Sequence, residues 1–179
     1  MSKAIRNLSK WRPNDEEWDH LFDEVRTQTD RGAGIIAGSF LDSALQLALQ
    51  SYLVPEPVLR ATEDAGAPLS TFSARILLGE ALGFYTAGVR KRLDTVRHIR
   101  NAFAHTLKPI TFDEPSISEA CKELKLFGFH GDTPPIPETW SEARKRYVST
   151  CYRHAHDLVG VALKHGGRLI TIEIDESQD

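Results

Sequence analysis

Apolar residues recur at helical spacing along most of the chain, at positions i, i+3, i+4 and i+7. Polar residues that cap helices, and Gly or Pro residues that end them, separate these apolar stretches. The predicted helices span residues 14–29, 33–53, 71–82, 87–107, 116–127 and 137–165. The pattern therefore predicts an all-α fold, a single bundle of five or six helices.

The stretch from about Ala33 to Leu53 is the most apolar part of the sequence, and it is apolar on two sides. A helix of that kind is expected at the centre of the bundle. Asp42, Gln46 and Gln50 interrupt it, and a lipid-facing span tolerates such groups poorly. We therefore expect a buried helix of a soluble protein, preceded by a break at residues 30–32.

Several segments are expected to lie outside the helices. Residues 54–69, which contain three prolines and a glycine, predict a loop, and residues 129–137 predict another. Residues 168–174 alternate like a β-strand, which needs a partner such as residues 110–112 or a second subunit. We expect an N-terminal arm over residues 1–13, a helical domain over 14–167, and a strand-like segment with an acidic tail over 168–179.

Composition narrows the class of protein. The chain has 179 residues, 41% of them hydrophobic and 26% charged, which fits one globular domain. Its net charge of −3 gives no overall positive field for DNA or an anionic membrane. Cys121 and Cys151 fall at apolar positions and are expected to be reduced core residues. With no secretory pattern at the N-terminus, we expect a cytoplasmic protein.

The segment 87–107 carries the most informative chemistry. On a helical projection Arg100 falls within about 20° of Val89, inside an apolar stripe that we expect to include Leu107. A guanidinium stays charged, so a buried one needs an acidic partner. Asp42 on the central helix is the best candidate for a supporting ion pair, and Glu80 is the second.

Asn101 and His105 lie one turn apart on the flank beside that stripe. Residues 90–108 contain six Lys and Arg against one Asp, a net charge of +5 in an otherwise acidic chain. Arg90, Arg97 and Lys108 are therefore the candidate phosphate- or RNA-binding residues. A solvated basic face, with His105 only capping the helix end, would explain the same pattern.

Other catalytic arrangements have less support. His154 and His156 lie about 200° apart on a helix and cannot chelate one metal ion, so no metal site is expected. Cys151 and His154 have helical spacing but fall on an apolar face, where a core pair is expected. The sequence contains no GxSxG, P-loop or GxGxxG motif, and we expect no cofactor.

The segment RNAFAH, from Arg100 to His105 near a helix end, resembles the Arg-x4-6-His signature of the HEPN superfamily. In catalytic members of that superfamily the arginine and histidine carry metal-independent RNA cleavage, commonly at a site shared by two subunits. Other members are inactive binding scaffolds. The resemblance implies Arg100, Asn101 and His105 as catalytic candidates and implies a homodimer.

Three longer segments together resemble the mannitol operon repressor-like family. They are DRGAGIIAGSFLDSAL (30–45), GAPLSTFSARILLGEALGF (66–84) and LDTVRHIRNAFAH (93–105), and the likeness covers about residues 14–165. That resemblance implies an all-helical transcriptional regulator. The sequence has no helix-turn-helix pattern, so direct sequence-specific DNA binding is not expected.

Three functions from different classes follow from these observations. The first is a regulatory domain that acts through protein contacts, with Arg100 and Asp42 holding the bundle together. The second is an endoribonuclease in which His105 moves the proton, Arg100 stabilises charge on the phosphate and Asn101 orients either group. The third is a nucleotide-binding module that uses the same basic flank without turnover. The expected partners are a second copy of the chain and either a protein or an RNA, with no membrane.

Overall fold

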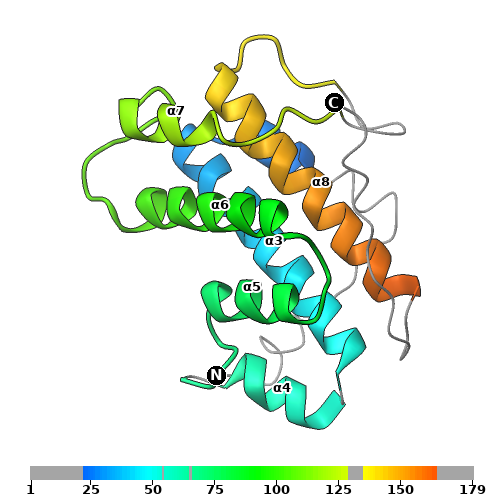
Figure 1. Ribbon diagram of the computed structural model, residues 1–179. Coiled ribbons are helices and arrows are strands. Elements are labelled where there is room, and N and C mark those ends of the chain that lie inside the picture. The colour runs from blue at the N-terminus through cyan, green and yellow to red at the C-terminus, as the bar shows by residue number, and fades with distance from the viewer. Residues whose placement is uncertain (1–21, 54, 65, 129–134, 165–179) are drawn as a thin grey trace.

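The structure is a computed structural model that describes residues 22–53, 55–64, 66–128 and 135–164. Within these ranges the chain is helical, with no β-strand, so the predicted all-α bundle is confirmed. Residues 22–27 are also helical. The helices with defined bounds, labelled in Figure 1, are α3 (Asp30–Tyr52), α4 (Pro55–Glu63), α5 (Phe72–Ala81), α6 (Ala87–His105), α7 (Pro115–Cys121) and α8 (Glu142–Lys164).

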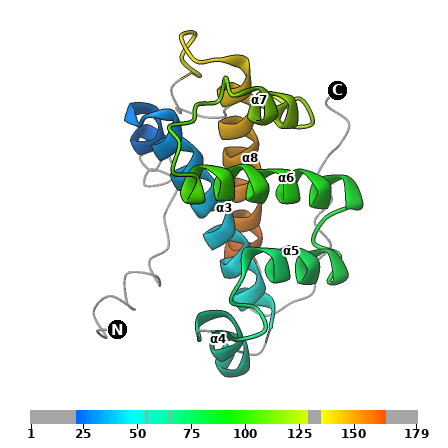
Figure 2. The same ribbon diagram turned by 90° about the vertical axis from the view of Figure 1, so that its left-hand side faces the viewer.

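Helices α3 and α8 pack side by side and run in the same direction (Figure 1). Asp30 at the start of α3 meets Arg144 at the start of α8, and the Tyr147 hydroxyl donates a 2.7 Å hydrogen bond to the carbonyl oxygen of Gly34 one turn later. Helices α5 and α6 cover α3 on another side (Figure 2). The prediction that α3 is the central helix is therefore confirmed.

Helix α3 begins at Asp30, three residues before the predicted start. Thr29 is the N-cap, and its side chain accepts a hydrogen bond from the backbone N–H of Gly32. Residues 30–32 thus form the first turn of the helix, and the predicted break there is wrong. Gly32 misled the prediction because glycine is rare within helices, yet it is tolerated in a first turn.

Two later glycines let α3 approach its neighbours closely. A Cβ atom on Gly34 would overlap the Phe103 ring of α6, and one on Gly38 would lie 2.6 Å from the Tyr147 hydroxyl and 2.8 Å from Cγ of Arg100. By length and composition alone α3 is apolar enough to cross a membrane. Half of that apolar window is buried inside the fold, however, as in the core helix of a soluble protein.

Helices α5 and α6 form an antiparallel pair. Thr71 is the N-cap of α5, with its side chain accepting from the N–H of Ala74. Helix α6 ends at His105, two residues short of the prediction, and Leu107 is 100% exposed rather than part of the apolar stripe. Lys108-Pro109 stops the helix early because the residue before a proline is disfavoured in helical geometry.

Helix α4 was missed in the sequence, where residues 54–69 predict a loop. Its two prolines, Pro55 and Pro57, fall in the first turn, where the backbone N–H groups have no helical partner and proline is tolerated. Thr62 is buried and accepts a hydrogen bond from Gln50 of α3. A proline-rich stretch can therefore be the start of a helix as well as the end of one.

Helix α7 is shorter than predicted. It begins at Pro115 with Glu114 as N-cap, one residue before the predicted start, and it ends at Cys121, six residues before the predicted end. Residues 125–128 are not helical. The apolar positions Leu124 and Phe127 face the bundle from a non-helical segment instead.

Helix α8 begins at Glu142, five residues after the predicted start at residue 137. Trp140 therefore precedes the helix. The N-terminal arm, residues 14–21 of the predicted first helix, residues 129–134 of the predicted loop and the strand-like segment 168–174 lie outside the described residues. The core is formed by fully buried side chains from all the main helices and the segment after α6, among them Leu41, Leu45, Leu49, Ile76, Leu93, Phe103, Phe112, Tyr147 and Leu158.

Candidate functional site

The carboxylate of Asp42 is the polar centre of the contact between α3, α5 and α6. Arg100 of α6 donates to Asp42 Oδ2 from Nη2 at 3.2 Å, which is the ion pair predicted from the sequence. A second cation, Arg75 of α5, donates to Oδ1 from both Nε, at 2.9 Å, and Nη2. The alternative partner, Glu80, pairs with Arg90 instead, at 3.1 Å.

This triad is mostly shielded from solvent. The side chains of Arg75, Asp42 and Arg100 are 7%, 15% and 24% exposed. Burial raises the pKa of the Asp42 carboxyl above its ordinary value, although the guanidinium groups of Arg75 and Arg100 act in the opposite direction. The fold therefore retains a charge that is costly to bury, and the two arginines offset that cost.

The triad separates Arg100 from the rest of the RNAFAH motif. Arg100 packs with its guanidinium carbon 5.6 Å from the Phe72 ring centroid, on the side of α6 that faces α3 and α5. His105 is exposed and Asn101 is half-buried. Five residues of helix turn His105 by about 140° from Arg100. Among the described residues, no side-chain hydrogen bond or ion pair joins any two of these three candidate catalytic residues.

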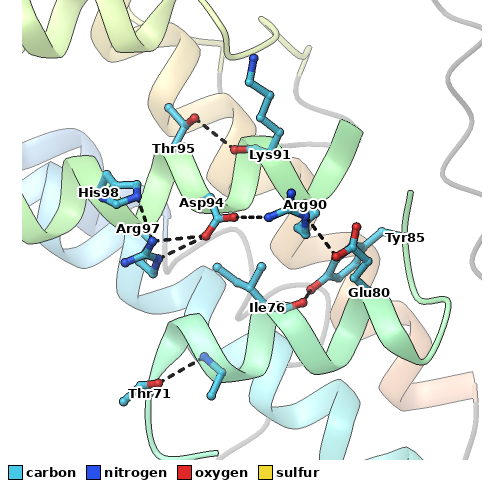
Figure 3. A network of polar contacts seen from close by, with 11 residues as sticks. Thr71, Ile76, Glu80, Tyr85, Arg90, Lys91, Asp94, Thr95, Arg97 and His98 are labelled. Carbon is cyan, nitrogen blue, oxygen red and sulfur yellow. Dashed lines mark hydrogen bonds and ion pairs between the residues drawn. The ribbon is translucent and has the colours of Figure 1, made fainter. Parts of the chain in front are cut away.

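The outer face of α6 carries a network of charged side chains (Figure 3). Arg90 lies between Glu80 and Asp94, with its Nη1 2.8 Å from Asp94 Oδ2. Arg97 reaches the same Asp94 carboxylate at 3.4 Å, and its Nη2 donates to Nε2 of His98 at 2.8 Å. Two arginines thus meet two carboxylates, so the charges of these four side chains balance.

The predicted phosphate-binding residues are therefore already engaged. Arg90 and Arg97 belong to this network, and Nζ of Lys108 lies 3.2 Å from Glu114. The structure does not bring Lys108 together with Arg90 and Arg97. Lys108 lies after the end of α6, where it pairs with Glu114. The formal charge of +5 over residues 90–108 is largely neutralised by acidic side chains from other segments.

Arg31 is a structural residue that the sequence reasoning missed. Its Nη1 donates to the carbonyl oxygens of Phe103 and Thr106, at 2.7 and 2.9 Å, and its Nη2 to that of Lys108, at 2.8 Å. These carbonyls belong to the last turn of α6 and the residues after it, which have no helical partner. Arg31 therefore fixes the backbone beside the fully exposed Leu107.

A second missed centre joins Asp30 to Arg144. Asp30 accepts from the N–H of Phe112 at 2.9 Å and from Nη1 of Arg144 at 3.0 Å. Arg144 also donates to the carbonyl oxygens of Val25 and Gln28 and stacks 4.2 Å from the Trp140 ring. Arg144 sits one turn before Tyr147 on the buried face of α8, so the signal that identified Arg100 would also have identified Arg144.

No family model matches the chain, and neither a curated protein nor a solved structure does. The family resemblance carried by residues 30–45, 66–84 and 93–105 therefore remains a prediction.

The remaining titratable groups of interest are buried. Cys121 and Cys151 are free and inside the core, as predicted, and burial raises the pKa of the Cys121 thiol to about 12. Burial lowers the pKa of His154 to about 4, so its imidazole is neutral at pH 7. Buried, protonated thiols are poor nucleophiles. Unlike His154, His105 of the RNAFAH motif is exposed, so solvent and partners can reach it.

Proposed function

We propose that this chain is a regulatory interaction domain of the mannitol operon repressor-like kind. It acts in the cytoplasm as a bacterial-type regulator of transcription, through protein contacts rather than through a helix-turn-helix. The observation that carries the proposal is the position of Arg100, which Asp42 holds beside Arg75 inside the α3–α5–α6 contact. A side chain used in this way supports the bundle and is turned away from His105.

The charges around α6 support the same function. A phosphate bound at Arg90, Arg97 or Lys108 would have to compete with Glu80, Asp94 or Glu114 for the cation. Breaking these partly exposed ion pairs costs a modest free energy, and each competing carboxylate also repels the phosphate. This surface is better suited to a protein partner than to the backbone of a nucleic acid.

The end of α6 offers such a partner an ordered apolar contact. Leu107 is 100% exposed, and three hydrogen bonds from Arg31 hold the backbone around it. A segment that is already ordered loses little conformational entropy on binding. We infer that Leu107, flanked by the exposed His105, is part of the surface through which the regulator acts.

One observation favours a metal-independent endoribonuclease as a second candidate. Arg100 uses a single hydrogen bond to Asp42, and its Nε is buried without a partner, so donors remain on a side chain that is 24% exposed. In that function Arg100 would stabilise the charge on the phosphate, His105 would act as acid or base, and Asn101 would orient either group. The 140° between Arg100 and His105 would then require His105 of a second copy.

Complementation in the host distinguishes the two functions. The gene is deleted, transcripts are sequenced, and the strain is complemented with the wild type, Leu107→Ser, His105→Ala or Leu77→Ser. Leu77 is 65% exposed on α5 and serves as the matched control. A contact-driven regulator predicts that Leu107→Ser fails to restore the transcript pattern, whereas His105→Ala and Leu77→Ser restore it.

The purified protein tests the second candidate directly. Single-stranded RNA is incubated with it in the presence of chelator, and the regulatory proposal predicts no cleavage. Cleavage that falls by roughly 10²–10⁴-fold in His105→Ala would instead establish the nuclease. The folding of Arg100→Ala is measured separately, because that variant also loses a contact of the bundle.

A further inference from the structure

The segment Leu124–Gly128, which we call the strap, lies along one face of α8 after the end of α7. Three hydrogen bonds hold its backbone. Arg146 Nη1 donates to the carbonyl oxygen of Leu124 at 3.0 Å, and Thr150 Oγ1 donates to that of Lys125 at 2.9 Å. The N–H of Phe127 donates to Ser149 Oγ at 3.2 Å.

Side chains of α8 hold the far end of the strap through its aromatic ring. The Phe127 ring meets the His154 imidazole edge to face, with centroids 5.5 Å apart, and the guanidinium of Arg153 lies 5.9 Å from it. Residues 146, 149, 150, 153 and 154 follow one another at helical spacing, so α8 presents a continuous row to the strap. His154 is the last position of that row.

His154 is buried in an environment that does not suit a charged imidazole. Its residue exposure is 1%, and neither Nδ1 nor Nε2 has a hydrogen-bond partner. The charged groups that act on it are Arg92 of α6 and, from α8, Arg153 and Asp157. Asp157 already accepts from Arg153 Nε at 3.1 Å, so a proton on His154 would add a third cation beside one carboxylate.

The strap is the weakest part of the cover over His154. Helices α6 and α8 keep their own backbone hydrogen bonds, whereas the strap depends on side chains of α8 for its backbone contacts. Local opening in proteins occurs first where few such contacts must break. Water would therefore reach the imidazole through displacement of the strap at a lower cost than through separation of the helices.

We propose that the strap is an acid-sensitive latch, in which a proton taken up from solvent by His154 detaches Phe127 and its neighbours from α8 while the helices stay packed. The proton binds the imidazole, and water then hydrates both N–H groups. Detachment exposes the Phe127 ring together with the row on α8. The opened surface differs from that around Leu107 and is independent of the function proposed above.

Amide hydrogen exchange of the full-length protein at pH 7.5 and pH 5.0 tests the latch. The measured quantity is the protection factor, which corrects for the intrinsic effect of pH on exchange. With a folded-state pKa of about 4 and an ordinary value of 6.5, acidification should lower the protection of the strap amides roughly thirty-fold. The amides of α6 and α8 exchange through global unfolding, which acid also favours through His154, but they should stay far better protected than the strap amides at both pH values because the helices stay packed when the strap opens.

Two substitutions at position 154 and one control make the test specific. His154→Phe cannot take a proton and keeps a ring against Phe127, so the loss of protection should disappear. His154→Gln provides the same test if that variant does not fold. His156→Phe, two residues away with a side chain that is 52% exposed, should respond like the wild type. Unchanged strap protection in the wild type at pH 5.0, strap amides as well protected as those of α6 and α8, or an unaltered response in the position-154 variants would each overturn the proposal.

Discussion

Arg75 holds the Asp42 carboxylate more closely than Arg100 does. Arg75 donates from two nitrogens to Oδ1, with Nε at 2.9 Å, whereas Arg100 donates from Nη2 alone to Oδ2 at 3.2 Å. The Arg75 side chain is also the more buried of the two, at 7% exposed against 24%. Asp42 is therefore primarily the partner of α5, and its contact with α6 is the weaker and more accessible one.

Removal of the shared carboxylate should destabilise the bundle strongly. Asp42→Ala leaves two shielded guanidinium groups without their partner, and we expect the free energy of unfolding to fall by ~3–5 kcal/mol. Urea denaturation followed by circular dichroism measures the change. The matched control is Asp94→Ala, whose carboxylate also serves two arginines but on the outer face of α6, and its cost should be about 1 kcal/mol or less. Equal costs for the two variants would mean that the triad is no better shielded than the surface network.

Gly34 should not tolerate a methyl group. Alanine ordinarily favours a helix over glycine by ~1 kcal/mol, but a Cβ at this position overlaps the Phe103 ring. We expect Gly34→Ala to destabilise the protein by ~1–3 kcal/mol, because α6 must move or Phe103 must leave its rotamer. Gly160→Ala in α8, where nothing lies within 4 Å, should instead stabilise it by up to ~1 kcal/mol. The Phe103→Leu substitution should recover part of the Gly34→Ala loss.

His154 should make the stability of the protein depend on pH. The pKa of His154 is about 4 in the folded chain, whereas an ordinary histidine, as in the unfolded chain, has a pKa of 6.5. Between these two pH values the unfolded chain therefore binds the proton more readily. Stability should therefore rise with pH through this window, by up to ~3 kcal/mol from this group. The measurement is the difference between wild type and His154→Phe in denaturant midpoints at pH 7.5 and pH 4.5. A constant difference across that range would contradict the assignment.

Arg31 should control the order of the chain at the end of α6. In Arg31→Met the carbonyl oxygens of Phe103, Thr106 and Lys108 lose their donor, and hydrogen bonds from a charged group contribute ~1.5–3 kcal/mol. We expect faster amide exchange at Thr106, which donates to Ala102, with little change in α8. Exchange that is unchanged at Thr106 would show that Lys108-Pro109 alone holds this turn.

We expect the protein to be a homodimer in solution. The HEPN resemblance implies paired subunits around the motif, and Leu107 gives that region an exposed apolar side chain. Size-exclusion chromatography with light scattering should give about twice the chain mass of 20.0 kDa at micromolar concentration. A measured mass near 20.0 kDa would contradict it.

The sequence was most informative where a single local rule governs the structure. The central helix followed from its apolar length, and the pairing of Arg100 with Asp42 followed from a permanent charge within an apolar stripe. Helix ends were less predictable. Glycine in the first turn of α3 and prolines in the first turn of α4 were interpreted as breaks, although both residue types are compatible with a helix start.

The contacts that were missed join residues far apart in the chain. Arg31 bonds to carbonyls more than 70 positions away, and Arg75 meets Asp42 across 33 positions, so no local pattern identifies either pair. Backbone carbonyls have no sequence signal of their own, which hides the role of Arg31 completely. Arg75 occupies the buried side of α5 next to Ile76, a position that predicts a buried charge but does not identify its partner.

The parallel contact of α3 with α8 has a consequence for synthesis of the chain on the ribosome. Gly34 and its partner Tyr147 are 113 positions apart. At roughly 5–20 residues per second, the most apolar helix emerges about 6–20 s before the helix that covers it. During that interval α3 is a substrate for any chaperone at the exit tunnel, and expression at low chaperone levels should yield aggregates in proportion to the delay.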